Sequence, residues 1–366
     1  MDVFICDPEC NARGGLSLAL EQLIQAGTMA QLRFWRLQRL EAESGFRLIT
    51  PDQRIDGCGS LDALLDRLRP AALVGVGWHN WSEVVLRHAQ RRNIPLVFWS
   101  HGVGCCVLYP LRPVAGLVRW LMRAPAPLAV IRTLRGLDAL VVAYPRCCWW
   151  DASSLDAAFA SRLGCPVRTM ANAIETTFWT PDSSQPTTPR PQLVSMGRLE
   201  WQKGHVQALE ILADARLPNS QLACLAPERT GQAYAFLSRA KALGLQRQVR
   251  LEIALDSEAR RAVLRQSLVY ISWSETEYQS LAMLEAMACG CVVIARPRGW
   301  LCERVIPGVL TTDSKQQASR LLRRLLQHPA LARRLGAAGA GYVHAHHALS
   351  GMREQSAGLL AELVQR

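Results

Sequence analysis

The 366-residue chain has few acidic and few aromatic residues. Its 30 Asp and Glu residues stand against 42 Lys and Arg residues, which gives a formal charge of +12. This excess points to an anionic partner such as a phosphorylated substrate or an acidic membrane surface, although basic residues also coat ordinary solvated helices. The aromatic residues, 7% of the chain, are not interleaved with the basic ones as base-stacking platforms would be. We therefore expect no nucleic-acid partner.

Sequence patterns that bind metals are also missing. None of the 12 cysteines belongs to the paired Cys-x-x-Cys motifs of a structural zinc site, and no Asp-x-Asp triplet is present to hold a divalent cation. We therefore expect no metal and no other cofactor.

No stretch combines the length and the apolar character of a membrane span. Residues 110–142 are the longest candidate, and prolines and five arginines interrupt them. Part of this stretch, residues 111–135, could lie on an anionic membrane surface, and a packed pair of basic helices explains it equally well. The first ten residues lack the basic and apolar regions of a signal peptide. We expect a cytoplasmic protein that could be peripheral at the inner face of the membrane.

Short apolar runs alternate with helical patterns along both halves of the chain. The first half predicts strands and helices over residues 3–6, 17–26, 72–76, 81–92, 95–99 and 139–143. The second half predicts them over residues 192–196, 205–215, 221–225, 249–253, 257–266, 268–272, 281–289 and 291–295, followed by two closing helices. Strands that alternate with helices favour parallel sheets, so the sequence predicts an α/β protein with two doubly wound, Rossmann-like domains.

A stretch rich in proline, serine and threonine separates the two halves. Residues 180–191 lack apolar periodicity, which favours an extended linker. The predicted domains are therefore residues 1–179 and 192–345, with a final helix over 346–366 that packs back toward the first domain. Ligands of such sheets bind beyond the carboxyl ends of the strands, so we expect the site in a cleft between facing domains.

Two glutamates lie around the start of one predicted helix. Ser280 is suited to the N-cap position, Glu277 lies in the loop before it, and Glu285 lies about one turn inside the helix. Both glutamates could face a ligand whose phosphate binds the exposed amides of the helix terminus at Ser280 and Leu281. A glutamate pair at this spacing also arises by chance.

Two basic residues follow a predicted strand in the second half. Arg198 and Lys203 lie in the loop after residues 192–196, where two cations could bind a diphosphate and stabilise it as it leaves. A pair of solvated surface charges is the alternative.

Together these segments resemble the retaining glycosyltransferases of family 4, which are group 1 glycosyltransferases with a GT-B fold. Residues 197–199, 203–204, Ser274, Glu277 and 285–290 meet the family pattern of Gly-Arg-Leu, Lys-Gly and Ser-x-x-Glu-(seven)-Glu-Ala-Met-Ala-x-Gly. Residues 172–181, NAIETTFWTP, also resemble the stretch with which such enzymes enter their second domain.

The first half carries a thinner resemblance. Gly14 and Gly15 resemble a glycine pair whose backbone amides approach the donor phosphates, and a simple tight turn explains them equally well. His101, in FWSHG, matches a histidine that many members present to the transferred sugar, although a lone histidine at a strand end is more often a structural hydrogen-bonding residue.

The resemblance implies two Rossmann-like domains that face across a cleft, with the acceptor in the first and the donor nucleotide in the second. It implies metal-independent transfer of a hexose, with retained configuration, from a nucleoside-diphosphate sugar to a hydroxyl of a glycan or lipid-linked acceptor, as in polysaccharide or lipopolysaccharide synthesis. Arg198 and Lys203 would stabilise the leaving diphosphate and Glu285 would hold the ribose hydroxyls. Glu277 would contact the donor sugar, beside which His101 would lie.

The sequence departs from the family pattern at three places. The family's Glu-Gly-Phe-Gly is Glu-Tyr-Gln-Ser over residues 277–280, a glycine-rich turn is replaced over residues 225–228, and Trp300 stands where a glycine is common. These changes motivate a second hypothesis, a catalytically silent partner subunit that binds a sugar nucleotide or a glycan. A sugar-nucleotide epimerase is a third, which the basic pair and the paired glutamates fit less well.

Overall fold

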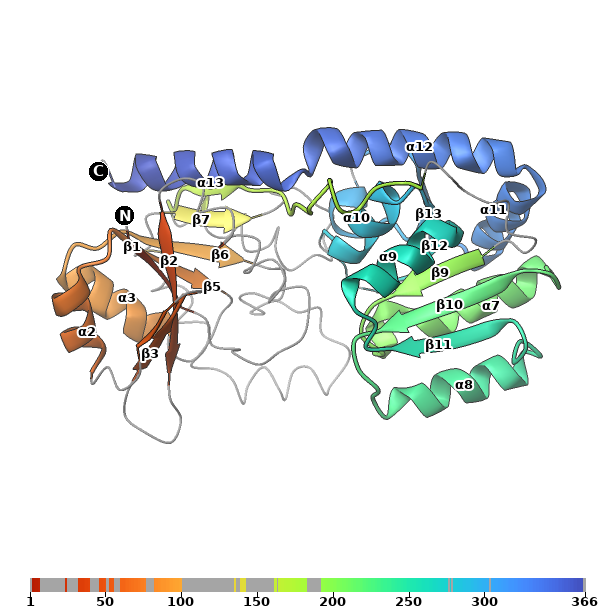
Figure 1. Ribbon diagram of the computed structural model, residues 1–366, viewed down its shortest axis with the longest axis horizontal. Helices are drawn as coiled ribbons and strands as arrows, with labels where there is room; N and C mark the ends of the chain where they lie inside the picture. The colour runs from red at the N-terminus through yellow and green to blue at the C-terminus, as the bar shows by residue number, and fades with distance from the viewer. Residues whose placement is uncertain are drawn as a thin grey trace. The chain divides into compact units, whose positions relative to one another are not determined.

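The computed structural model describes residues 2–6, 24, 32–39, 46–50, 53–55, 60–76, 82–100, 135, 139–142, 161–162, 164–182, 192–275, 277, 279–302 and 304–364. The chain divides into two compact units, the first of residues 1–171 and 350–366 and the second of residues 172–349. Each unit is built on its own sheet (Figure 1). The predicted linker lies mostly outside the described residues, so its position stays a prediction.

The first unit contains an eight-stranded sheet in the order β4-β3-β2-β1-β5-β6-β7-β8. These strands are β1 (Asp2–Cys6), β2 (Arg33–Arg39), β3 (Phe46–Ile49), β4 (Arg54–Ile55), β5 (Ala72–Val76), β6 (Leu96–Ser100), β7 (Ala139–Val142) and β8 (Val167–Thr169). The strands of the run β2-β1-β5-β6-β7-β8 pair in parallel, whereas the pairs β2–β3 and β3–β4 are antiparallel. The predicted parallel sheet is therefore present, and two antiparallel strands that the sequence analysis did not predict extend it at this edge. Strand β2 was not predicted from the sequence, because basic residues such as Arg33 and Arg36 interrupt its apolar pattern.

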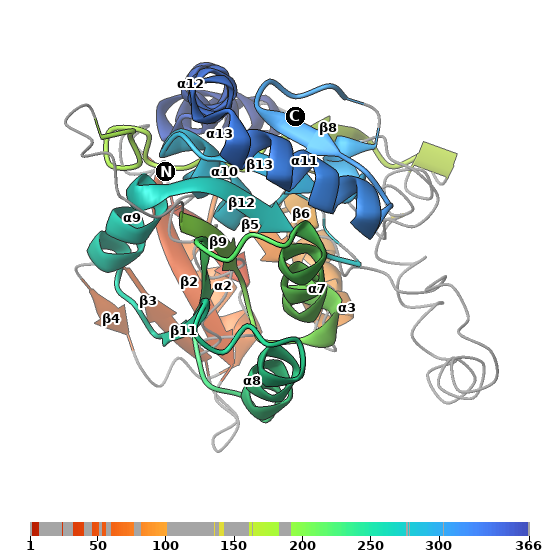
Figure 2. The same ribbon diagram turned by 90° about the vertical axis from the view of Figure 1, so that its right-hand side faces the viewer.

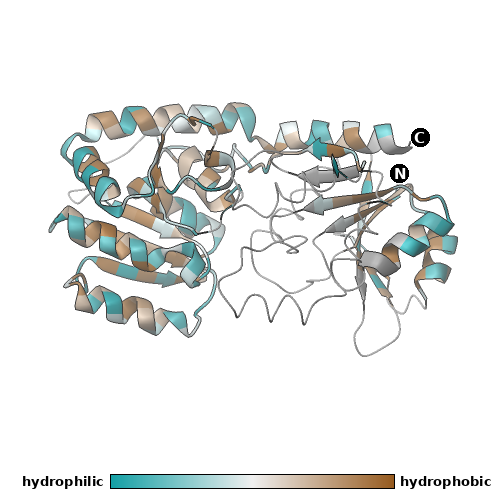
Figure 3. Ribbon diagram, turned by 180° about the vertical axis from the view of Figure 1, so that it is seen from behind, coloured by the Kyte–Doolittle hydropathy of each residue, from teal (hydrophilic) through white to brown (hydrophobic). Residues whose placement is uncertain are grey.

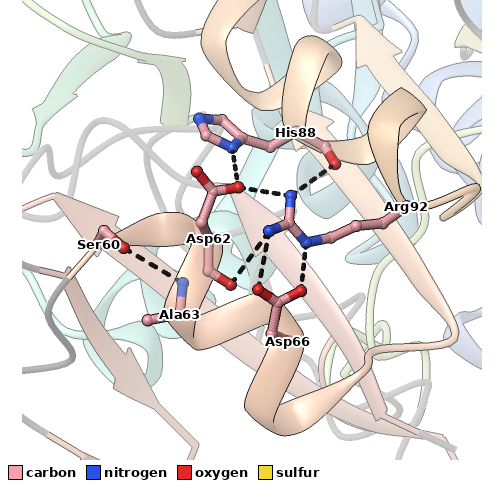
Figure 4. A network of polar contacts seen from close by, with 6 residues as sticks. All are labelled: Ser60, Asp62, Ala63, Asp66, His88 and Arg92. Carbon is pink, nitrogen blue, oxygen red and sulfur yellow. Dashed lines mark hydrogen bonds and ion pairs between the residues drawn. The ribbon is translucent and has the colours of Figure 1, made fainter.

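Two helices of the first unit are joined by a polar network (Figure 4). Helix α2 (Leu61–Leu68) begins at Ser60, whose hydroxyl accepts a hydrogen bond from the Ala63 amide. From α3 (Ser82–Arg91), His88 Nδ1 lies 2.6 Å from Asp62 Oδ1. Just beyond α3, the Arg92 guanidinium binds Asp62 at 2.5 Å and Asp66 at 2.7 Å. The network fixes α3 against α2.

The second unit contains a six-stranded, all-parallel sheet in the order β11-β10-β9-β12-β13-β14. Its strands are β9 (Gln192–Met196), β10 (Gln221–Ala226), β11 (Val249–Ile253), β12 (Ser267–Ser272), β13 (Val292–Ala295) and β14 (Val309–Thr311). The chain runs outward from β9 through β10 to β11 and then returns to β12 on the other side of β9. This reversal creates a topological switch point, where ligands of doubly wound sheets bind.

Helices cover both faces of this second sheet. They are α7 (His205–Ala215), α8 (Gln232–Ala242), α9 (Ser257–Gln266), α10 (Leu281–Ala288), α11 (Lys315–Gln327) and α12 (Pro329–His346), with short 3-10 turns η1 (Trp201–Lys203) and η2 (Gly299–Leu301). Helix α7 packs against α8 and α11, and α10 packs against α9 and α12 (Figure 2). The strands are largely hydrophobic and the helices alternate between hydrophilic and hydrophobic residues (Figure 3), as expected for a buried sheet between amphipathic helices.

The predicted closing helices need a correction, because three are present. Helix α11 ends before His328, Pro329 begins α12, and α13 (Leu349–Val364) follows after a short break. Proline at the first helical position starts a new helix because it lacks the amide that a continued helix needs. From Ser350 onward the last helix belongs to the first unit, where Ser356 bonds Met170 and Arg168 pairs with Glu362. Within the described part of the chain, no helix has the length and apolar character to cross a membrane.

Candidate functional site

Segments far apart in the sequence meet at the switch point of the second sheet. Strands β9 and β12 are parallel neighbours, so the loops that follow Met196 and Ser272 leave the same edge. Lys203 lies in the loop after β9 and Glu277 in the loop after β12. The distance between Lys203 Nζ and Glu277 Oε2 is 3.1 Å. The Ser274 hydroxyl donates to the same carboxylate oxygen at 3.2 Å. The structure thus brings together two of the predicted site residues.

A glycine allows these two loops to touch. Gly204 has φ +71°, and a Cβ atom there would lie 2.1 Å from the Trp273 carbonyl oxygen. The Glu275 amide also donates to the Gln202 carbonyl at 2.7 Å. The Lys-Gly pair of the sequence motif therefore has two separate tasks: the lysine supplies a cation, and the glycine lets the loop that carries it pack on β12.

A buried histidine that the sequence analysis missed supports Arg198. His205 begins α7, and its Nδ1 lies 2.9 Å from the Ser195 hydroxyl while its Nε2 lies 3.2 Å from the Arg198 carbonyl oxygen. Burial lowers the pKa of His205 to about 4, against the opposing effect of its backbone hydrogen bonds. The ring is therefore neutral at physiological pH and holds the backbone after β9. The Arg198 guanidinium is half-exposed and pairs with Glu200 at 3.0 Å, so it does not join the Lys203–Glu277 pair.

Tyr270 is a buried residue of β12 that interacts electrostatically with Glu277 and Glu285. Its hydroxyl donates to the Met196 carbonyl at 3.2 Å, which ties β12 to the end of β9. Burial raises the pKa of Tyr270 well above its usual range, and the charges of Glu277 and Glu285 raise it further. The tyrosine escaped the sequence analysis because an aromatic residue in an apolar strand reads as core.

The start of α10 is fixed by Ser280 and by its neighbour Gln279. The Ser280 hydroxyl caps the helix by accepting the Met283 amide at 3.3 Å, and Leu281 is buried at the first helical position. Gln279, which stands where the family has a phenylalanine, accepts the Asn172 amide at 2.5 Å, and its carbonyl accepts the Asn172 side chain at 2.8 Å. Gln279 thus attaches the loop before α10 to the segment at residue 172.

Glu285 is a buried acid on α10. Its side chain is 2% exposed, and Arg260 of α9 is the cation that lies against it, with 3.7 Å between Nη1 and Oε2. Among the described residues, Oε2 has no hydrogen-bond donor. Burial raises the pKa of Glu285 to about 7, and the charge of Arg260 opposes that shift. A carboxylate buried without donors is costly unless a ligand supplies them.

Trp300 and residues 225–228 are two places where the sequence departs from the family pattern, and the structure shows how each one packs. Trp300 is buried, and its ring packs edge-on against His347 with 5.3 Å between ring centroids. Leu225 and Ala226 end β10 and are buried, and Thr230 then ties the following loop to the Leu199 carbonyl at 2.9 Å. Gly14, Gly15 and His101 lie outside the described residues, and their roles stay predictions.

Comparison with known proteins supports this reading of the second unit. Residues 180–341 match the family described as glycosyl transferases group 1. No curated protein matches the chain by sequence. Among solved structures, sucrose-phosphate synthase from Thermosynechococcus elongatus is similar, with 18% identity and a TM-score of 0.80 over 100% of this chain and 99% of that one.

Two further solved structures have the same fold. HepE from Anabaena, in complex with UDP-glucose, has 13% identity and a TM-score of 0.72 over 99% of this chain and 100% of that one. A glycosyltransferase from Rickettsia africae has 12% identity and a TM-score of 0.66 over 100% of this chain and 99% of that one.

Two α/β units of this topology define a protein of the GT-B fold, which confirms the predicted fold class. The family match assigns residues 180–341, most of the second unit, to the group 1 glycosyltransferases, and it supports a function in sugar transfer. The assignment to family 4 stays a prediction.

Proposed function

We propose that the chain is a metal-independent, retaining hexosyltransferase that uses a nucleoside-diphosphate sugar as its donor. The acceptor would be a hydroxyl of a glycan or a lipid-linked sugar, of the polysaccharide or lipopolysaccharide type. The observation that carries the proposal is the Lys203–Glu277 pair at the switch point of an all-parallel sheet. It sets a cation and a carboxylate side by side where a doubly wound sheet binds its ligands.

Each charged residue of this edge has a task in the proposed reaction. Lys203, joined by the exposed Arg198, would bind the diphosphate and stabilise its charge as it leaves. Lys203 now pairs with Glu277, so a bound diphosphate would compete for the cation and leave the carboxylate to accept hydroxyls of the donor sugar. Glu285, whose buried Oε2 has no donor among the described residues, would accept the ribose hydroxyls. The amides at the start of α10 would add to phosphate binding.

The donor is tested by measuring thermal stabilisation of the purified full chain by UDP-, GDP-, ADP- and dTDP-sugars, with and without a chelator. A ligand at about 100 times its Kd stabilises the folded state by about 2.7 kcal/mol, which is measurable. HepE was solved with UDP-glucose and with UDP and glucose, so uridine donors come first. Stabilisation by one donor that survives the chelator supports the proposal, and stabilisation that needs a divalent metal contradicts metal independence.

Lys203→Ala tests the role of the cation. We expect turnover to fall roughly 10²-fold or more, because a contact to the leaving diphosphate is lost. Lys241→Ala is the matched control, since Lys241 is an exposed lysine in the last turn of α8. Steady-state release of the nucleoside diphosphate measures both variants. Near-normal turnover of folded Lys203→Ala would refute the assignment.

A catalytically silent donor-binding subunit is the second candidate function. Tyr278 and Ser280 replace the two glycines of the family's loop, and between them the Gln279 side chain bonds Asn172. Stabilisation by a donor without any release of nucleoside diphosphate would favour this function over transfer.

Association with a membrane completes the proposal for the acceptor. The basic stretch at residues 111–135, of which the structure describes residue 135 alone, would lie on anionic lipid at the inner face of a cytoplasmic membrane. Flotation of the protein with anionic liposomes at low salt tests this, and failure to float would remove the lipid-linked acceptor from the proposal.

A further inference from the structure

Two buried polar atoms lie in neighbouring side chains without hydrogen-bond partners. Glu285 Oε2 has no donor and Arg260 Nε has no acceptor among the described residues. The two side chains face each other, with 3.7 Å between Arg260 Nη1 and Glu285 Oε2. That distance gives a charge interaction but exceeds a hydrogen bond. Hydroxyl groups, which donate and accept, have the chemistry to satisfy the carboxylate.

Arg260 is held in place independently of Glu285. Its guanidinium carbon lies 5.5 Å from the centroid of the Trp179 ring, and its Nη2 donates to the Ser257 hydroxyl at 3.1 Å. Trp179 is itself buried. A planar guanidinium stacked on an aromatic ring keeps a fixed orientation, which a lysine in its place would lose.

The titratable groups that interact with Glu285 lie on three elements. Arg260 of α9 favours the ionised carboxylate. Tyr270 of β12 and Cys289 at the end of α10 also interact with Glu285, and burial raises the pKa of both groups, so both are neutral near pH 7. Arg260 is therefore the group among these that opposes the cost of burying the Glu285 charge.

We propose that Arg260 is a positioning residue for the donor nucleotide. It keeps Glu285 ionised and correctly placed to accept the hydroxyls of a ribose, and it thereby creates a preference for ribonucleotides over 2′-deoxyribonucleotides. This inference rests on the proposed donor site. It goes beyond that site because it assigns the choice between ribose and 2′-deoxyribose in the nucleotide to Arg260, a residue of α9 that lies outside the sequence motifs.

The test compares the affinities of the full chain for UDP and for 2′-deoxy-UDP by calorimetry. If the donor screen favours another base, the ribo and deoxy diphosphates of that base replace them. The wild type should bind the ribonucleotide roughly tenfold more tightly or better, as expected for lost hydrogen bonds to an ionised carboxylate. In Arg260→Gln this ratio should fall close to one, mainly because the affinity for the ribonucleotide falls.

Arg261→Gln is the matched control. Arg261 is the next residue of α9, and its guanidinium lies 4.1 Å from the centroid of the Phe178 ring, but it is not paired with Glu285. The control removes an arginine–aromatic contact of the same kind. If the loss of such a contact merely destabilised α9, the ratio of affinities would change in both variants. We expect it to keep the wild-type ratio.

Each outcome separates this inference from the proposed function. A wild type that binds no nucleotide overturns the donor site itself. A wild type that prefers the ribonucleotide, with the same ratio in Arg260→Gln, overturns the role of Arg260 and leaves the donor site standing. If Arg260→Gln does not fold, Arg260→Lys replaces it: lysine keeps the charge but not the planar stack, so the ratio should fall about threefold or more. An unchanged ratio would then overturn the inference.

Discussion

Gly204 shows how a single residue determines the geometry of the site. With φ +71° and a Cβ position 2.1 Å from the Trp273 carbonyl oxygen, alanine meets both backbone strain and a clash with backbone. We expect Gly204→Ala to lower the free energy of unfolding by about 2 kcal/mol or more. Urea denaturation followed by circular dichroism measures it. Gly231→Ala is the control, because φ there is −56° and no atom lies within 4 Å of the added Cβ. Equal stability of the two variants would contradict this account of the loop.

In the proposed donor site, Glu285 should make donor binding depend on pH. Burial raises the pKa of its carboxyl to about 7, and ribose hydroxyls would bind its ionised form. We therefore expect affinity for a sugar nucleotide to rise between pH 6 and pH 8, by up to about tenfold per pH unit below the pKa. The diphosphate of a sugar nucleotide is esterified at both ends, so it does not titrate in this range. Glu285→Gln should bind more weakly and without this slope, and a slope unchanged in the variant would assign it to another group.

The raised pKa of Glu285 also affects the stability of the protein without ligand. As the pH rises, this stability falls, whereas the affinity for the donor rises. A carboxyl whose folded-state pKa is raised binds its proton more tightly in the folded state. Stability from this group is therefore present below the ordinary carboxyl pKa and is lost as the pH rises through about 7.

The resemblance to the family motifs was enough to propose that Lys203 and Glu277 belong to one site, and the structure places them 3.1 Å apart. It was not enough to find Tyr270, His205 or Arg260. A tyrosine in an apolar strand and a histidine at a helix start have ordinary structural roles in most proteins. Arg260 lies on a polar helix, and its importance depends on a buried partner that is distant in the sequence.

At the scale of elements, the network between α2 and α3 should make stability depend on acid pH. Hydrogen bonds from His88 to Asp62 and from Arg92 to Asp66 lower the pKa of each carboxyl. Stability from a lowered pKa is present above the ordinary carboxyl pKa and is lost as the pH falls through the folded value. We expect the urea midpoint of the wild type to fall below about pH 4.

Asp66→Asn should flatten this acid dependence, because it removes one of the two carboxylates that bind Arg92 (Figure 4). Asp214→Asn, an exposed aspartate of α7, is the control and should keep the wild-type slope. Urea midpoints measured from pH 6 to pH 3 compare the three proteins. An Asp66→Asn slope as steep as that of the wild type would show that the network does not contribute.

The sequence predicted four elements of the second unit with the bounds that the structure gives them. Strands β9 and β11 and helices α7 and α9 have the predicted bounds, because their apolar residues follow a clear period of two or 3.6. The antiparallel strands β3 and β4 were missed, since both are short and only partly buried. Burial on one side leaves few apolar residues to form a recognisable pattern.

At the scale of the whole molecule, the fold could be predicted from the motifs of one half. The match to group 1 glycosyltransferases covers residues 180–341, whereas the likeness to sucrose-phosphate synthase covers 100% of the chain. The sequence analysis found no motif of similar strength within the described residues of the first unit. Its expected contributions, Gly14, Gly15 and His101, stay predictions.

The central claim is that this chain transfers a sugar from a nucleotide donor with retained configuration. The most direct measurement is time-resolved proton NMR of the purified chain with the donor that stabilises it, in which the anomeric signals of the first product are recorded with water or an added glycan as acceptor. The account predicts release of the nucleoside diphosphate and a first product with the anomeric configuration of the donor. A first product of inverted configuration, or an intact donor in the presence of bound protein and acceptor, would contradict it.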